Sequence, residues 1–289
     1  MIEAKIILDS LAPSGRRLTT FQLRYPRFIH AEFMTHRVFS RNASSSRAIP
    51  VNKMIDQIES DWAKPIVFHK NTKGMQGKVP LTVNESSLAL HIWEEAKNDA
   101  IKHARRLVQL GVHKQQANRI LEPFMHTSVV CTATEYDNFF ALRHHHMAQP
   151  EIEILAMSMY DAYKNSEPVK LEAGQWHLPY VGTGYDYKNT NYSMYTLDEM
   201  IKMSVARCAR VSYLRHDGTN PSFEDDAKLY DRLLGAQPIH ASPAEHQAMA
   251  SVVDNIPSGN LFGWTQYRKT LRGENVKKFL PGMFDDGDR

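Results

Sequence analysis

The sequence has little of what marks secreted disulfide-bonded domains or membrane proteins. It contains two cysteines in 289 residues, Cys131 and Cys208, and neither belongs to a pair with metal-binding or redox spacing. No apolar run approaches the length of a membrane span, and the first residues lack a signal-like block. These absences predict two reduced thiols, no membrane association and a cytoplasmic protein.

The chain also lacks a strong excess of either charge. Its 35 basic and 32 acidic residues give a formal charge of +3, and 42% of its residues are hydrophobic, which is ordinary for a globular protein. This balance argues against a protein that coats nucleic acid. It is compatible with a local cationic pocket for a small anionic ligand.

Periodicity predicts a hairpin followed by helices. Residues 4–11 and 17–25 alternate as two strands around Pro13-Ser14-Gly15, and a helix opens at Pro26. A long amphipathic helix is expected over 84–110, with Asn84 as cap and Gly111 as stop. Further helices are predicted at 113–121, 150–163, 196–214, 223–234 and 261–272. Residues 167–193 break the periodicity and predict a long structured loop or an insertion.

A polar run directly after the first helix indicates an anion site. Thr35-His36-Arg37-Val38-Phe39-Ser40-Arg41-Asn42-Ala43-Ser44-Ser45-Ser46-Arg47 combines arginines, a histidine and hydroxyls. Arginine forks bind phosphate or a pyrimidine edge, and consecutive serines add donors in a turn. The alternative is a solvated surface turn.

Arg143-His144-His145-His146 suggests a metal site at first glance. Consecutive helical positions point about 100° apart, so three adjacent imidazoles cannot face one ion. We therefore predict no metal.

Four separated motif blocks stand out along the sequence. They are Thr35-His36-Arg37 with Ser40, Asn42, Ser45 and Arg47; Ala117-Asn118-Arg119-Ile120-Leu121; Asn138-Phe139-Phe140-Ala141-Leu142-Arg143 with Ala148-Gln149 and Glu151-Ile152; and Ala209-Arg210-Val211-Ser212-Tyr213 with His240-Ala241-Ser242-Pro243-Ala244-Glu245-His246. Together they resemble the flavin-dependent thymidylate synthases. Their order differs from that family, in which the blocks found late here come before the Arg-His-Arg block, as though the chain were circularly permuted.

The resemblance implies an α+β fold, a mixed and mostly antiparallel sheet with helical layers. It implies one domain over residues 1–289, with an insertion or rewired loop at 167–193. It further implies methylation of dUMP to dTMP with FAD, methylenetetrahydrofolate and NADPH, in a homotetramer with shared active sites.

The resemblance also assigns roles to residues. Arg143 would be catalytic, stabilising the ring anion electrostatically. Nucleotide binding would fall to Glu32, Phe33, Thr35, Ser44, Ser45, Ser46, Arg47, Arg119 and Arg143. Flavin binding would fall to His36, Arg37, Thr132, Thr134, Asn138, Ser212, His240, Ser242 and Glu245.

Several positions depart from the family pattern and keep alternatives open. Thr35, Glu32 and Ala43 replace an arginine, a glutamine and an acidic residue, which motivates a relative acting on dCMP or hydroxymethylating dUMP. Glu32 would repel a phosphate unless it pairs with an arginine or faces elsewhere. Thr132 and Thr134 stand where the family commonly has Asn and Arg for the flavin. An inactive nucleotide-binding homologue is therefore a third hypothesis.

Three residues also have structural interpretations. Arg143 could form a helix-end salt bridge with Glu135 or Glu151. His240 could be a structural histidine. Cys208 is more easily a buried small side chain than a nucleophile.

Overall fold

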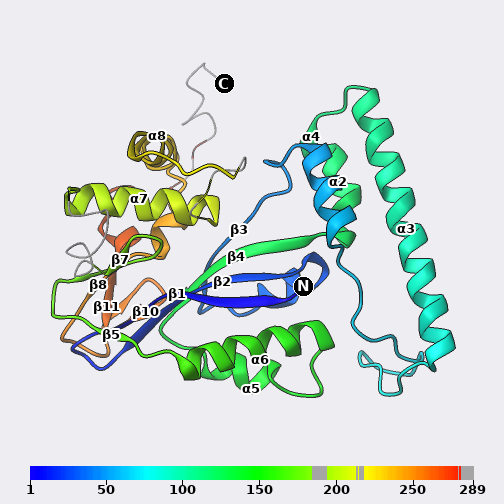
Figure 1. The fold of residues 1–289 in the computed structure, drawn as a ribbon. Coiled ribbons are helices and arrows are strands. Elements are labelled where there is room, and N and C mark those ends of the chain that lie inside the picture. The colour runs from blue at the N-terminus through cyan, green and yellow to red at the C-terminus, as the bar shows by residue number, and fades with distance from the viewer. Residues whose placement is uncertain (184–193, 213, 215–217, 279, 281–289) are drawn as a thin grey trace.

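The computed structural model describes residues 1–183, 194–212, 214, 218–278 and 280, and it is an α+β fold. A five-stranded sheet has the order β3-β4-β2-β1-β5, and a four-stranded sheet has the order β11-β8-β6-β7. The larger sheet is mostly antiparallel, as predicted, with β1 and β5 as its parallel pair, and the described strands of the smaller sheet pair antiparallel. Figure 1 shows helices on more than one side of the larger sheet.

The predicted hairpin is confirmed. β1 (Glu3–Leu11) pairs with β2 (Arg17–Pro26), and Gly15 supplies the positive φ of 84° in the turn. The other side of β2 pairs with β4 (His126–Ala133), and β4 pairs in turn with β3 (Ser40–Ala43). Sequence reasoning missed β3 and β4.

An aromatic core joins this sheet to the helices that lie along it in Figure 1. After β2 come a 3-10 turn (Arg27–Ile29) and α1 (His30–Phe33), which together match the predicted opening helix. α5 (Asp137–Arg143) and α6 (Pro150–Asn165) cover the sheet, and the predicted helix at 150–163 is confirmed. Buried members of the core include Phe21, Leu23, Tyr25, Phe33, Phe139, Ile152 and Leu155.

A second core lies beside the sheet, between α2 (Val51–Ser60), α3 (Val83–Gln109) and a 3-10 segment, Asn118–Phe124. The cap of α3 is Thr82, which forms a capping box with Glu85, so the predicted Asn84 cap is wrong. Gly111, with φ of 76°, follows the helix as predicted. The predicted helix at 113–121 is a short α4 (Lys114–Ala117) that continues into the 3-10 segment.

The late part of the chain builds the smaller sheet and two helices. The helix predicted over 196–214 is α7 (Leu197–Arg210), and it ends at Val211, which has a φ of 58°. α8 (Phe223–Leu234) has the predicted bounds.

The helix predicted over 261–272 is wrong. Leu261 and Trp264 are buried in short strands, and only a 3-10 turn follows. Two short strands therefore imitated helical spacing. The segments concerned are β10 (Leu261–Phe262), β11 (Trp264–Gln266) and the 3-10 turn Tyr267–Thr270.

The segment at 167–193 contributes strands to both sheets. Its short strands are β5 (Val169–Lys170), β6 (Trp176–Leu178) and β7 (Gly182–Thr183); residues 184–193 lie outside the described residues. The remaining short elements are a 3-10 turn at Ser242–Glu245, β8 (Ala248–Ala250) and β9 (Pro257–Ser258). β8 pairs with both β6 and β11. Within the described part of the chain, no helix is both long and apolar enough to cross a membrane.

Candidate active site

The polar run lies along the edge strand β3 and the turn after it. Arg41, on β3, donates from Nη1 to the carbonyl oxygens of Met34 and His36, each at 2.9 Å. It thereby caps the end of α1 and fixes the turn that presents His36. The side chains of Thr35 and Arg37 are exposed beside it, and Thr35 donates to the carbonyl of Glu32 at 2.7 Å.

Arg143 is held at the end of α5 by two partners from the polar run and the helix before it. Its Nε donates to His36 Nε2 at 3.0 Å, and its Nη1 donates to Glu32 Oε2 at 3.3 Å. The partners therefore differ from Glu135 and Glu151, the two considered from sequence. Glu32 was expected to repel a phosphate unless it paired with an arginine, and Arg143 is that arginine.

His36 is neutral at pH 7. Burial, followed by the charges of Arg143 and Arg41, lowers the pKa of His36 from 6.5 to about 4. A neutral imidazole can accept the hydrogen bond from Arg143. Its ring packs on Phe39 and against the edge of Phe139, with centroids 5.9 and 4.9 Å away. Arg143 thus has a rigid support while its side chain keeps 23% exposure.

The serine turn is held from below by hydrogen bonds and faces a carboxylate. Ser44 Oγ accepts from the backbone N–H of Ser128 at 3.1 Å. Ser46 Oγ donates to Glu122 Oε1 at 2.6 Å, and Arg119 Nη1 donates to the same oxygen at 2.8 Å. The structure therefore brings Ser46 and Arg119, two predicted nucleotide contacts, to one point.

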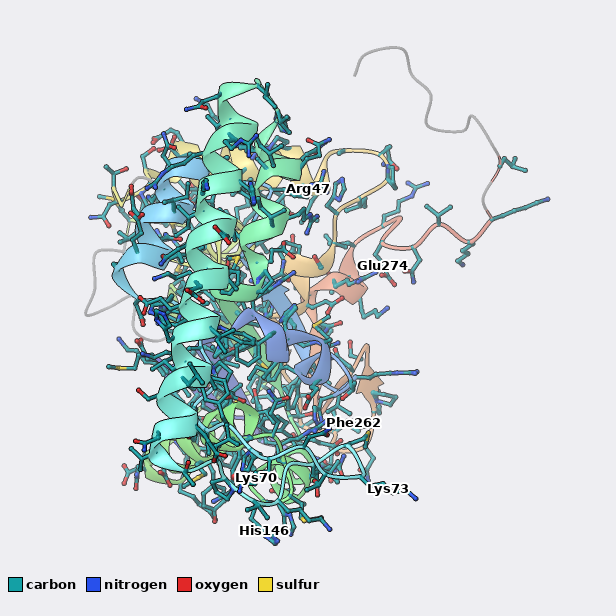
Figure 2. All side chains as sticks on the ribbon, turned by 90° about the vertical axis from the view of Figure 1, so that its right-hand side faces the viewer. Arg47, Lys70, Lys73, His146, Phe262 and Glu274 are labelled. Carbon is teal, nitrogen blue, oxygen red and sulfur yellow. The ribbon has the colours of Figure 1, made fainter. Side chains whose placement is uncertain are left out.

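The other predicted nucleotide residues lie in differing environments. Ser45 and Arg47 are exposed on the same turn, whereas the Phe33 side chain is fully buried in the aromatic core. Figure 2 shows Arg47 far from His146, so the histidine run lies outside this turn. His145 and His146 are exposed neighbours, and no cluster of three metal-binding side chains occurs among the described residues.

A series of buried hydrogen bonds, called the relay below, crosses the sheet beneath the polar run. Thr132 Oγ1 lies 2.7 Å from Thr20 Oγ1 and 2.8 Å from His246 Nδ1. Thr20 continues the chain to His177 Nε2 at 2.8 Å, and His177 Nδ1 reaches Ser10 Oγ at 2.9 Å. All five side chains are buried.

Burial fixes the protonation state of the two histidines in the relay. It lowers the pKa of both His177 and His246 to about 3, so both rings are neutral. The hydroxyl of Thr132 is buried and hydrogen-bonded to Thr20 and His246 within the relay, so it does not face open space. Thr134, the other threonine predicted to touch flavin, accepts from the backbone N–H of Phe262 at 3.4 Å.

The relay joins the early and late motifs. The amide of Asn42 is best satisfied with its nitrogen toward His246 Nε2, at 3.2 Å, and toward the carbonyl oxygen of Ser242, at 3.1 Å. Ser242 and His240 are exposed, whereas Glu245 is ion-paired with Arg268. The exposed Asn138 lies in the first turn of α5, the helix that ends at Arg143. Segments about 200 residues apart therefore meet at β3.

A cavity of about 340 Å³ lies between the sheet, α2 and the end of α7. Its lining includes Ser44 from the polar run and Ser212 from the late motif, along with Arg24, His126 and Arg210. Burial and the charge of Arg24 lower the pKa of His126 to about 4, so its ring is neutral and lies 3.2 Å from Arg24 Nη2. Two arginines and several hydroxyls line the cavity, but both arginines already have acidic partners. Arg24 pairs at 2.8 Å with Asp61, which also lines the cavity, and Arg210 pairs with the buried Asp226.

Val211 lines the same cavity in a conformation that valine rarely adopts. Its φ of 58° lies in the left-handed region, where a β-branched side chain is strained. This strain turns the chain sharply after α7 and places Ser212 at the cavity. Such strain is typical of functional sites.

Neither cysteine is available as a nucleophile. Both thiols are free and buried; burial raises the pKa of Cys131 to about 12 and raises that of Cys208 further. The prediction that Cys208 is a buried small side chain is confirmed.

Sequence reasoning missed five residues of this region: Arg24, Arg41, Glu122, His126 and His246. Arg41 and His246 stand inside the quoted motifs and could have been found there. The others depend on contacts that no local pattern shows.

The profile of the thymidylate synthase complementing proteins matches residues 18–169, and the chain belongs to this family. The match covers the first three motif blocks, whereas the fourth lies beyond it, so permutation stays a prediction.

Several similar proteins are named flavin-dependent thymidylate synthases. A flavin-dependent thymidylate synthase of Kosmotoga olearia is 26% identical over 56% of this chain and 69% of its own length. One from Aquifex aeolicus is 28% identical over 47% of this chain, and there the alignment spans only 42% of the relative. A solved structure of the UMP/dUMP methylase PolB from Streptomyces cacaoi bound with 5-Br UMP has a TM-score of 0.46 and 17% identity, over 56% of this chain and 88% of that one.

Proposed function

We propose that this chain methylates dUMP to dTMP as a flavin-dependent enzyme. The observation that carries the proposal is Arg143, supported by neutral His36 and ion-paired with Glu32, in a family whose relatives are named thymidylate synthases. Its remaining N–H groups are free to face a ligand because only Nε and Nη1 have partners among the described residues.

The chemistry needs a nucleophilic carbon 5 on the uracil ring. A buried thiol of raised pKa cannot add to carbon 6, so the ring must be activated without cysteine. Arg143 would hold a pyrimidine carbonyl and stabilise the negative charge that develops on the ring. A half-buried guanidinium on a fixed support suits this task because it needs little reorganisation.

The nucleotide phosphate would lie at the serine turn. Ser45, Ser46, Arg47 and Arg119 present hydroxyls and cations there, and a nucleoside monophosphate carries about two negative charges. The hydrogen bonds beneath the turn hold its backbone in place before a ligand arrives.

The arginines and hydroxyl at the cavity make it the proposed place for the phosphate-bearing part of FAD, with the pyrophosphate taking the place of Asp61 beside Arg24. Arg24, Arg210 and Ser212 in the cavity would hold its pyrophosphate, and exposed Arg37, Asn138 and Ser242 would contact other parts. Bound flavin would supply the reducing equivalents for the transferred carbon. NADPH, methylenetetrahydrofolate, a homotetramer with shared sites, a single working domain and a cytoplasmic location belong to the same proposal.

A second candidate is a relative that acts on dCMP or leaves a hydroxymethyl group on dUMP. The Glu32–Arg143 pair favours it, since a carboxylate beside the catalytic arginine can also accept a hydrogen bond from an exocyclic amine. Thr35 and Ala43 point the same way as departures from the family pattern. An inactive nucleotide-binding homologue is the third candidate.

The test is a product assay with FAD, methylenetetrahydrofolate and NADPH. The chain is given dUMP and dCMP in parallel, and the products are weighed by mass spectrometry. We expect dUMP to gain one methylene group in mass. A hydroxymethyl product, or turnover of dCMP alone, would favour the second candidate; no product with either would leave the binding homologue.

A further inference from the structure

Glu122 occupies the point where an anionic ligand would meet the serine turn. A single oxygen, Oε1, accepts from Ser46 Oγ at 2.6 Å and from Arg119 Nη1 at 2.8 Å. A hydroxyl and a guanidinium converging on one oxygen is the arrangement that binds phosphate. Here the chain itself supplies the anion.

The surroundings separate this carboxylate from the scaffold of the turn. Asn118 Nδ2 donates to the carbonyl oxygens of Ser46 and Ile49 at 2.7 and 2.9 Å, so the backbone of the turn is held without Glu122. Ser44 is tied to β4 by its own hydrogen bonds. The Glu122 contacts therefore occupy donors rather than build the loop.

The pair with Arg119 lies at the surface. The Arg119 side chain is 52% exposed and that of Glu122 is 21% exposed. An ion pair between residues three apart, with the arginine half exposed, contributes little to stability, so Arg119 leaves Glu122 at small cost. The buried Ser46 would exchange its hydrogen bond to Glu122 for one to the phosphate. A phosphate dianion brings more charge and more acceptor oxygens than one carboxylate does.

We propose that Glu122 is an internal competitor that occupies Ser46 and Arg119 until the phosphate of a pyrimidine nucleoside monophosphate displaces it. The inference rests on the proposed function, which places the phosphate at this turn. Glu122 thereby sets specificity for ligands with a phosphate strong enough to displace a carboxylate. It weakens the binding of the phosphate and leaves the binding of the pyrimidine unchanged.

The test is Glu122→Gln, which keeps the shape and an acceptor oxygen but removes the charge. Dissociation constants of dUMP, deoxyuridine and inorganic phosphate are measured by calorimetry on the full chain. We expect dUMP and phosphate to bind about tenfold tighter, because like-charge repulsion is lost. Deoxyuridine binding should not change.

A matched control removes the same charge elsewhere. Glu59 pairs with Arg105 at 2.8 Å on α2 and α3, and both side chains are about half exposed. Glu59→Gln should leave all three constants unchanged. Because Arg119 is the group set free, the gain should disappear in an Arg119→Ala background.

The outcomes separate the two proposals. Wild-type binding of dUMP with no gain, or a loss, in Glu122→Gln would overturn the competitor role and leave the proposed function standing. Binding of neither dUMP nor phosphate by any variant would overturn both. Glu122→Ala provides the same readout if the glutamine variant folds poorly.

Discussion

Two arginine–glutamate pairs carry proposed nucleotide contacts, and they are built differently. Arg143 is braced by a neutral histidine on an aromatic wall, and its side chain is 23% exposed. Arg119 is 52% exposed and shares its glutamate with a serine hydroxyl. Under the proposed function, this difference would hold Arg143 in place for chemistry and leave Arg119 able to exchange one anion for another.

The largest effect that tests this comparison is expected from removing Arg143. Arg143→Ala should lower kcat by about 100-fold or more, because a positioned donor to a developing anion is lost. Its flavin content should not change.

Arg119→Ala is the matched variant for the other pair. It should raise KM for dUMP by about tenfold with kcat largely kept, because uniform binding is lost. Steady-state kinetics with dUMP measure both variants. Equal losses in kcat for the two variants would erase the distinction, and unchanged turnover in Arg143→Ala would remove its catalytic role.

An intermediate effect is expected in the relay that supports the early and late motifs. Thr132→Val keeps the shape but leaves Thr20 and His246 short of a partner, so we expect a loss of about 2 kcal/mol in the free energy of unfolding. Urea denaturation measures it.

Thr127→Val is the matched control on the same strand. Thr127 is equally buried, but among the described residues its hydroxyl makes one long contact, 3.4 Å from Ser44 Oγ. It should cost less than about 1 kcal/mol. Equal losses would show that the relay adds nothing beyond packing. A marked loss of FAD affinity in a stably folded Thr132→Val would instead favour the direct flavin contact predicted from sequence.

A further effect is a pH dependence of stability, carried by His36 beside Arg143 and by the two buried histidines of the relay. The pKa of His36 falls from 6.5 to about 4, and those of His177 and His246 fall to about 3, mainly through burial. Below pH 6.5 these histidines bind protons in the unfolded chain but stay neutral in the folded chain. The free energy of unfolding therefore declines as the pH falls from 6.5 toward the lowered pKa values.

Each such histidine adds a slope of up to about 1.4 kcal/mol per pH unit. Denaturation midpoints measured from neutral pH downward follow this slope, and His246→Asn should make it shallower. Stability that stays level or rises as the pH falls would contradict the neutral state of these rings.

Local pattern predicted the hairpin and the helices at 150–163 and 223–234, because each carries a clear period and a terminal signal. β4 was missed because it is buried on both faces and shows no alternation. The helix over 261–272 was wrong because Leu261 and Trp264 imitate helical spacing while lying in separate strands.

The candidate site residues likewise divide into those that a local motif predicts and those that only the fold brings together. The motifs predicted Arg143, Ser46, Arg119 and Ser242, since arginines and hydroxyls are typical ligands of anions. The partners that define their state come from far along the chain: Glu122 meets Ser46 across 76 positions, and His246 meets Thr132 across 114. Only the fold shows that a carboxylate occupies the serine turn.

The absorbance spectrum of the purified chain, titrated with FAD and then with dUMP, tests the central claim most directly. If the early and late motifs build one site for flavin and nucleotide, the protein takes up FAD and dUMP then perturbs the flavin bands. A colourless protein that takes up no FAD, or flavin bands that dUMP leaves unchanged, would contradict the account.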